Sequence, residues 1–188
     1  MQKLPRLGLW VLLSVCCLGG MAPRASASVL RALKLDELAE RADRIVLGRV
    51  EKLESRWTDD HSAIFTEVTL VVERTYKGST GPGERLVVRK EGGSVAGIGM
   101  RVYGAPEFSV GEEAVVFTEP RGRARFVSGM AQGKLQLVRD AAGSERLVWS
   151  VGSATLLGQP DERLLRPLPL DDFERLLVKV LDQVRGAR

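Results

Sequence analysis

His61 is the single histidine of the 188-residue chain, and it ends the run Asp59-Asp60-His61. Imidazole and carboxylate groups are ordinary metal ligands, and a histidine can also activate a serine nucleophile as its general base. A metal site needs three or four ligands, and this spacing matches no familiar set. We therefore interpret the run as the solvated tip of a loop between two strands, and we expect no catalytic residue, no metal site and no cofactor.

A second candidate for chemistry is the glycine-rich stretch 91–106, with the sequence EGGSVAGIGMRVYGAP. A phosphate-binding loop would need a Gly-Lys-Ser/Thr ending and a following helix, and this stretch has neither. A connection of this length in a compact domain usually has a function, and its apolar residues argue against disorder. We predict a recognition edge, with a lid folded back on the core as the alternative. The predicted binding residues of this stretch are Gly92, Gly93, Val95, Ile98, Gly99, Met100 and Tyr103.

Both cysteines, Cys16 and Cys17, lie in an N-terminal segment with the layout of a secretory signal peptide. Two basic residues precede an apolar run at 7–18, and the small residues Ala25-Ser26-Ala27 follow it. We predict cleavage after residue 27 and export to the periplasm or the medium. The alternatives are an uncleaved anchor, although the run is shorter than the ~20 residues of a spanning helix, and a lipid-modified Cys16.

Loss of residues 1–27 would change the charge of the chain from basic to nearly neutral. The segment carries Lys3, Arg6 and Arg24 and no acidic residue, so 25 basic residues would remain against 24 acidic ones, a net charge of +1. This charge offers no strong electrostatic attraction for nucleic acid or an anionic membrane. The mature chain would also contain no cysteine, so its core must be stable without a disulfide.

The elements that must position these residues are mostly strands. The longest extended pattern covers residues 64–78, IFTEVTLVVERTYKG, where residues of one parity are suited to burial and those of the other are mostly polar. Gly48 lies within an earlier strand, where a glycine marks a bulge, a bend or a close backbone approach, as in a small closed barrel. We expect further strands at residues 44–53, 85–90, 113–119, 125–127, 134–138 and 146–151, with a polar loop at 54–62.

Two helices complete the prediction, a short one at 36–42 and a longer amphipathic one at 170–186. Asp171 and Glu174 have the spacing of a capping box at the start of the second helix. We predict that its apolar stripe docks on the strands; a partner-binding or dimer helix is the alternative. The segment 153–169 contains three prolines and is predicted to be an irregular linker.

Three short motifs carry a resemblance to known proteins. They are the strand Ala42-Asp43-Arg44-Ile45-Val46-Leu47-Gly48-Arg49-Val50, the strand end Tyr76-Lys77-Gly78, and the strand start Gly111-Glu112-Glu113. In this order they resemble uncharacterised secreted bacterial proteins. More distantly, residues 28–120 are similar to the OB-fold module of tissue inhibitors of metalloproteinases and of netrin-type domains. The strand pattern alone is compatible with a small barrel or a sandwich, and the resemblance implies the barrel. We therefore predict a mainly β fold, a small OB-like closed barrel at 28–152, with a short N-terminal helix and a docked C-terminal helix.

The resemblance also implies a function. In those inhibitors the amine and carbonyl of an N-terminal cysteine chelate the zinc of the protease, and disulfides fix the segment. Ser28 occupies the matching position here, and the disulfide cysteines are missing. Ser28, Val29 and Leu30 are therefore predicted to form a second binding surface, with a secreted metalloprotease as the partner. We expect a secreted, non-enzymatic binding module; the alternatives are a hydrolase that uses His61 and an envelope structural protein.

Overall fold

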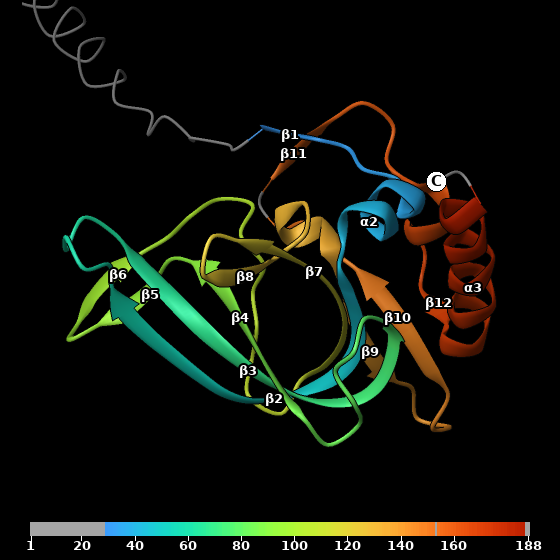
Figure 1. Ribbon diagram of the computed structural model, residues 1–188, viewed down its shortest axis with the longest axis horizontal. Coiled ribbons are helices and arrows are strands. Elements are labelled where there is room, and N and C mark those ends of the chain that lie inside the picture. Colours follow the sequence, from blue (N-terminus) through green and yellow to red (C-terminus); the bar gives the residue numbers. More distant parts are fainter. Residues whose placement is uncertain (1–28, 153, 187–188) are drawn as a thin grey trace, which may run out of the picture.

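A computed structural model describes residues 29–152 and 154–186 of the chain (Figure 1). The predicted signal segment 1–27 and the predicted binding residue Ser28 lie outside the described residues. The fold is mainly β, as predicted, with one large sheet and a C-terminal helix. Within the described ranges, no helix is both long enough and apolar enough to cross a bilayer.

Eight strands form the large sheet in the order β12-β10-β9-β7-β2-β3-β4-β8. Their bounds are Arg44–Trp57 for β2, Ile64–Lys77 for β3, Arg85–Glu91 for β4, Glu113–Arg121 for β7, Ala124–Val127 for β8, Lys134–Arg139 for β9, Glu145–Trp149 for β10 and Leu168–Pro169 for β12. Two small sheets pair β1 with β11 and β5 with β6; their bounds are Val29–Arg31, Thr155–Leu157, Gly93–Val95 and Ile98–Met100. The helices are α2 (Leu35–Arg41) and α3 (Leu170–Gly186), and short 3-10 turns span Met130–Gly133 and Glu162–Leu164.

β3 is the strand predicted from the period-two pattern, and its alternation is confirmed. Its even-numbered residues from Ile64 to Val72 are buried, while the odd-numbered residues between them are half-buried. β3 pairs antiparallel with β2 and β4, and β2 pairs antiparallel with β7. β7 also pairs with β8, and β8 meets β4 at one parallel pair, Arg89 with Phe126. The pairing path from β2 through β3, β4, β8 and β7 therefore returns to β2.

β2 and β7 carry apolar residues on both parities because they separate two hydrophobic cores. Ile45 and Leu47 face a helix-side core, which contains the buried stripes of α2 and α3. Val46 and Val50 face a strand-side core, which the buried residues of β3, β4 and β7 complete. Three consecutive apolar residues at 45–47 are therefore explained by burial on both faces of β2.

Gly48 marks a close backbone approach, as predicted. The register of β2 against β3 shifts between Leu47 and Gly48. A Cβ atom at Gly48 would lie 2.8 Å from the carbonyl oxygen of Val71, so only glycine fits without a shift of the backbone.

The loop between β2 and β3 was predicted to start at residue 54, and this start is wrong. β2 continues to Trp57 in register with β3. Polar side chains do not end a strand whose backbone groups still have partners.

α3 docks on the helix-side core, as predicted. Phe173 and Leu177 are fully buried, and the ring of Phe173 lies edge-on to Tyr76 at 6.4 Å between centroids. Glu174 does not reach back to cap the helix; its carboxylate accepts hydrogen bonds of 2.7 Å from the Tyr76 hydroxyl and from the Arg74 guanidinium. Burial, with the Glu174 hydrogen bond adding to it, raises the pKa of Tyr76. Glu174 therefore joins α3 to β3.

The segment predicted to be an irregular linker contains β11, a 3-10 turn and β12, and it is tied to the fold at three places. β11 pairs with β1, and β12 pairs with β10. The buried Asp161 carboxylate accepts a 3.0 Å hydrogen bond from the backbone N–H of Leu35, at the start of α2. Strands of two or three residues are too short to show a periodic pattern, which is why the sequence did not indicate them.

Candidate binding site

The glycine-rich stretch folds as the β5–β6 hairpin and is anchored at the first residue of β3. The carbonyl oxygen of Ile64 accepts a 2.8 Å hydrogen bond from the Gly92 N–H, and the N–H of Ile64 donates to the sulfur of Met100 at 3.2 Å. A Cβ atom at Gly93 would collide with the hydroxyls of Ser55 and Thr66, which are 2.9 Å apart. The backbone at this end of the hairpin therefore lies tightly against β2 and β3.

Three large apolar side chains of the stretch are exposed to solvent, and one of them, Met100, also takes part in the anchor through its sulfur. Ile98 is 58% exposed, Met100 37% and Tyr103 38%, and we call these three residues the hairpin rim. Of the other predicted binding residues, Gly92 is buried, Gly93 and Val95 are half-buried, and Gly99 is exposed. The side chains of the rim are not folded over a core as a lid would be. Recognition of a partner by the rim stays a prediction.

The predicted N-terminal surface lies apart from the hairpin tip. Val29 is 55% exposed in β1, which pairs with β11 at the top of the view, whereas β5 and β6 lie at its left (Figure 1). Leu30 meets the far end of the glycine-rich stretch, because a Cβ atom at Gly104 would lie 3.1 Å from its Cδ1. The buried Gln132 carboxamide fixes this segment by accepting from the Leu33 N–H at 2.8 Å. The fold thus brings Gly104, and not the hairpin tip, to the N-terminal surface.

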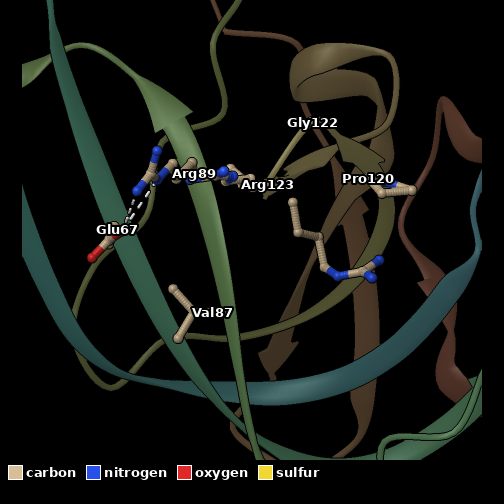
Figure 2. A pocket seen from close by; sticks show the side chains of 8 residues that line it. Glu67, Val87, Arg89, Pro120, Gly122 and Arg123 are labelled. Atoms are coloured by element: carbon tan, nitrogen blue, oxygen red, sulfur yellow. Dashed lines mark hydrogen bonds and ion pairs between the residues drawn. The ribbon is translucent and has the colours of Figure 1, made fainter. Parts of the chain in front are cut away.

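A groove runs along the outer face of β3 and β4 beside the hairpin. Its apolar part, about 450 Å³, is lined by Ile64, Phe65, Met100, Val102 and Phe126 among others. Its basic part, about 390 Å³, lies between Glu67, Val87 and Arg89 and the turn that joins β7 to β8 (Figure 2). Because Arg89 lines both parts, we treat them as one feature, the strand groove.

Arginines cover the aromatic rings of the strand groove. The Arg89 guanidinium lies 4.2 Å from the centre of the Phe65 ring and pairs with Glu67 at 2.9 Å. Arg121 lies over Phe126 at 5.2 Å and pairs with Glu119. Stacking of a guanidinium on an aromatic face is favourable, and it also occupies that face.

Two further arginines line the basic part of the groove from the β7–β8 turn. Arg125 forms an ion pair with Asp43. Arg123 is exposed, and among the described residues it has neither an ion pair nor a hydrogen-bond partner. The basic part is lined by Arg89, Arg123 and Arg125 against a single acid, Glu67, and therefore carries an excess of positive charge.

Apart from Met100, the residues of the strand groove were not predicted from the sequence, although one signal for them existed. Phe65 and Val87 occupy the parity of their strands that faces away from the strand-side core, and Val87 is 46% exposed. Large apolar residues on the outer face of a half-buried strand suggest a covered or binding surface. The β7–β8 turn gave no such signal, because its approach to β4 depends on the tertiary fold.

His61 lies in the tight turn between β2 and β3, as predicted, with its ring centre 6.1 Å from that of Trp57. The neighbouring Asp60 carboxylate is occupied by the turn itself. Hydrogen bonds from the Thr58 hydroxyl, and then from the N–H and hydroxyl of Ser62, lower the pKa of Asp60 to about 2. Within ranges 29–152 and 154–186, no three His, Cys, Asp or Glu side chains are grouped to hold a metal ion.

Comparison with protein-family models, with curated proteins and with solved structures finds no match to this chain.

Proposed function

We propose that the protein is an exported, non-enzymatic binding module, and that a protein partner contacts the hairpin rim and the strand groove beside it. The observation that carries this proposal is the exposure of Ile98, Met100 and Tyr103 in the glycine-rich stretch, where Met100 also lines the apolar cavity. Several exposed apolar residues in one short stretch next to a concave site are typical of interaction surfaces in soluble proteins. Scattered single apolar residues would carry no such meaning.

We also propose that β2, β3, β4, β8 and β7 form an OB-like barrel. The returning pairing path and the parallel pair between β4 and β8 support this architecture. OB folds bind their ligands on the face of the second and third strands, next to the loops after the first and the fourth. Counted from β2, those strands are β3 and β4, which carry the strand groove. The position of the groove therefore agrees with the proposed function.

The proposal is tested by capture with a matched pair of variants. Mature chain 28–188 is immobilised and exposed to culture supernatant and envelope extract, and each captured protein is then purified and its affinity measured. Ile98 and Val178 are exposed to the same degree, 58% and 57%, on the hairpin and on α3. We expect Ile98→Asp to weaken partner binding at least tenfold and Val178→Asp to leave it unchanged. Equal binding of the partner by both variants would show that the hairpin rim does not contact it.

Inhibition of a secreted metalloprotease is a second candidate function, favoured by the contact between Leu30 and Gly104. This contact joins the N-terminal segment to the glycine-rich stretch, so a single partner could touch both. A mature chain that begins at Ser28 is expected to slow a secreted metalloprotease, and one extra residue before Ser28 should abolish the effect. Full protease activity at micromolar concentrations of the mature chain would contradict this function.

Export is proposed from the N-terminal sequence, and it is tested separately. Expression in a bacterial host, followed by N-terminal sequencing of the protein in the periplasm and the medium, should give a chain that starts at Ser28. A full-length chain retained with the membrane would favour the anchor, and a processed chain that begins at Cys16 would favour the lipoprotein.

A further inference from the structure

One edge of β4 is open over half of its length. Gly92 donates to the carbonyl of Ile64, and Val72 donates to the carbonyl of Glu84. Because hydrogen-bonded pairs alternate along an antiparallel ladder, the even-numbered residues of β4 are bonded to β3. The N–H and C=O groups of Arg85, Val87 and Arg89 therefore point toward the opposite edge.

That opposite edge has a partner strand at one position. β8 pairs with β4 only through Arg89 and Phe126, and within the described residues no strand lies beside Arg85 or Val87 on this side. The turn before β8 faces Val87 across the basic part of the strand groove, as Figure 2 shows. An open edge next to a cavity is a template for strand addition by an extended chain, since main-chain hydrogen bonds supply affinity and side-chain pockets supply specificity.

The charge of the basic part of the strand groove favours an acidic chain as the added strand. Arg89 is paired with Glu67 and Arg125 with Asp43, whereas Arg123 has no partner among the described residues. A carboxylate on an incoming strand would meet this unpaired guanidinium, and a basic chain would be repelled. Arg89 and Arg121 already occupy faces of Phe65 and Phe126, which disfavours the base stacking that single-stranded nucleic acid requires.

We propose that the strand groove binds an extended acidic peptide segment of a protein partner, which adds as a strand to the open edge of β4 at Arg85 and Val87 and places a carboxylate on Arg123. This inference rests on the proposed binding function and names its mode of recognition. The apolar part of the groove, beyond Arg89, receives an apolar side chain of the same segment.

The test uses a capped peptide of alternating threonine, valine and glutamate residues, with a second peptide in which lysine replaces glutamate. Binding to isotope-labelled mature protein is followed by NMR, with amide exchange read at Arg85 and Val87. We expect the acidic peptide to slow exchange of both amides and to bind at least tenfold more tightly than the basic one. Arg123→Glu should weaken binding at least tenfold, and Arg166→Glu, the same charge change at another exposed arginine, should not.

A backbone variant separates strand addition from charge attraction. Val87→Pro removes a donor from the open edge while the bonds to β3 remain, and Val87→Thr keeps the donor. Val87→Pro should abolish binding of the acidic peptide, and Val87→Thr should retain it. If the proline variant does not fold, slower exchange of the Val87 amide in the unmodified chain tests strand addition instead.

Failure of strand addition can be told from failure of the binding function. Peptide binding without a change at the Val87 amide would overturn strand addition, and so would the absence of peptide binding. Displacement of the peptide by single-stranded oligothymidine at equal concentration would overturn the acidic peptide as the ligand. None of these results alters the capture experiment with Ile98→Asp, which tests the binding function through a different residue.

Discussion

The α3 helix and the β5–β6 hairpin lie at opposite sides of the molecule and use their apolar residues in opposite ways (Figure 1). α3 buries Phe173 and Leu177 completely against a second helix and the sheet. The hairpin leaves Ile98 and Met100 exposed, although both are as apolar as the residues of α3. The presence of a second layer of structure, and not residue type, therefore decides whether an apolar side chain belongs to the core.

Polar contacts follow the same division. On the helix side, buried or half-buried carboxylates join elements far apart in sequence, with Glu174 bound to β3 and Asp161 bound to the start of α2. The hairpin is joined to β3 through Ile64, partly by a weak bond to the Met100 sulfur, and through Thr66, whose hydroxyl donates to the Gly92 carbonyl at 2.7 Å. We infer that the helix side supplies stability and that the hairpin side is free to carry function.

The largest expected effect is on the helix side. Phe173→Ala removes a fully buried ring and leaves a cavity in the helix-side core, so it should lower the free energy of unfolding by about 3–5 kcal/mol. Val178→Ala, on the exposed face of the same helix, should change it by less than about 0.5 kcal/mol. Denaturant unfolding monitored by circular dichroism measures both. Equal losses from the two variants would show that α3 is not docked.

Asp161→Asn should lower the free energy of unfolding by about 1.5–3 kcal/mol at neutral pH, because charge-assisted bonds to Arg163 and to Leu35 are weakened. Burial raises the pKa of Asp161, but the Arg163 guanidinium and the two backbone N–H groups outweigh it and hold the pKa below the ordinary 3.8. The charged form therefore stabilises the fold above pH 3.8, and this contribution is lost as the pH falls through the folded-state pKa. Unfolding curves below pH 3.8 should fall less steeply for the variant; parallel curves would contradict the assignment.

Substitution of two glycines on the hairpin side should lower the free energy of unfolding by less, and by different amounts at the two positions. Gly93→Ala places a methyl group against Ser55 and Thr66 at a φ of 150°, and the strain should cost about 1–3 kcal/mol and loosen the hairpin. Gly97→Ala, at the tip, meets no atom and should cost only about 1–2 kcal/mol, from its φ of 82°. Amide exchange at Ile64 reports the anchor. Exchange of the Ile64 amide should accelerate in Gly93→Ala and not in Gly97→Ala. An unchanged rate in both variants would show that the anchor does not depend on Gly93.

The smallest expected effect on stability comes from the hairpin rim itself. Ile98→Asp changes an exposed side chain that contributes to neither core, so the free energy of unfolding should stay within about 0.5 kcal/mol of the unmodified chain. Thermal unfolding provides the measurement. A loss of several degrees in Tm would mean that Ile98 packs in solution, and the contrast with α3 would then disappear.

Local patterns predicted much of the fold. The alternation from Ile64 to Val72, the stripe of α3 and the close approach at Gly48 all depend on residues near one another in sequence, and all three are confirmed. β11 and β12 escaped prediction because their pairing with β1 and β10 is set by distant segments. Glu174 was misassigned because Tyr76 and Arg74, its actual partners, lie about a hundred residues away.

The site was predicted less completely than the fold. The glycine-rich stretch indicated an exposed apolar loop, and the exposure of Ile98, Met100 and Tyr103 agrees with that prediction. The strand groove depends on the turn after β7 lying across from β4, an arrangement that no local pattern encodes. Arg123 is one of many exposed arginines in the sequence, and only the fold places it beside an open strand edge.

Hydrogen–deuterium exchange of the mature chain, with and without its captured partner, tests whether the hairpin side is the binding surface. We expect slower exchange in the β5–β6 hairpin and at the open edge of β4, with no change in α3. Protection confined to α2 and α3, with the hairpin and β4 unaffected, would contradict it.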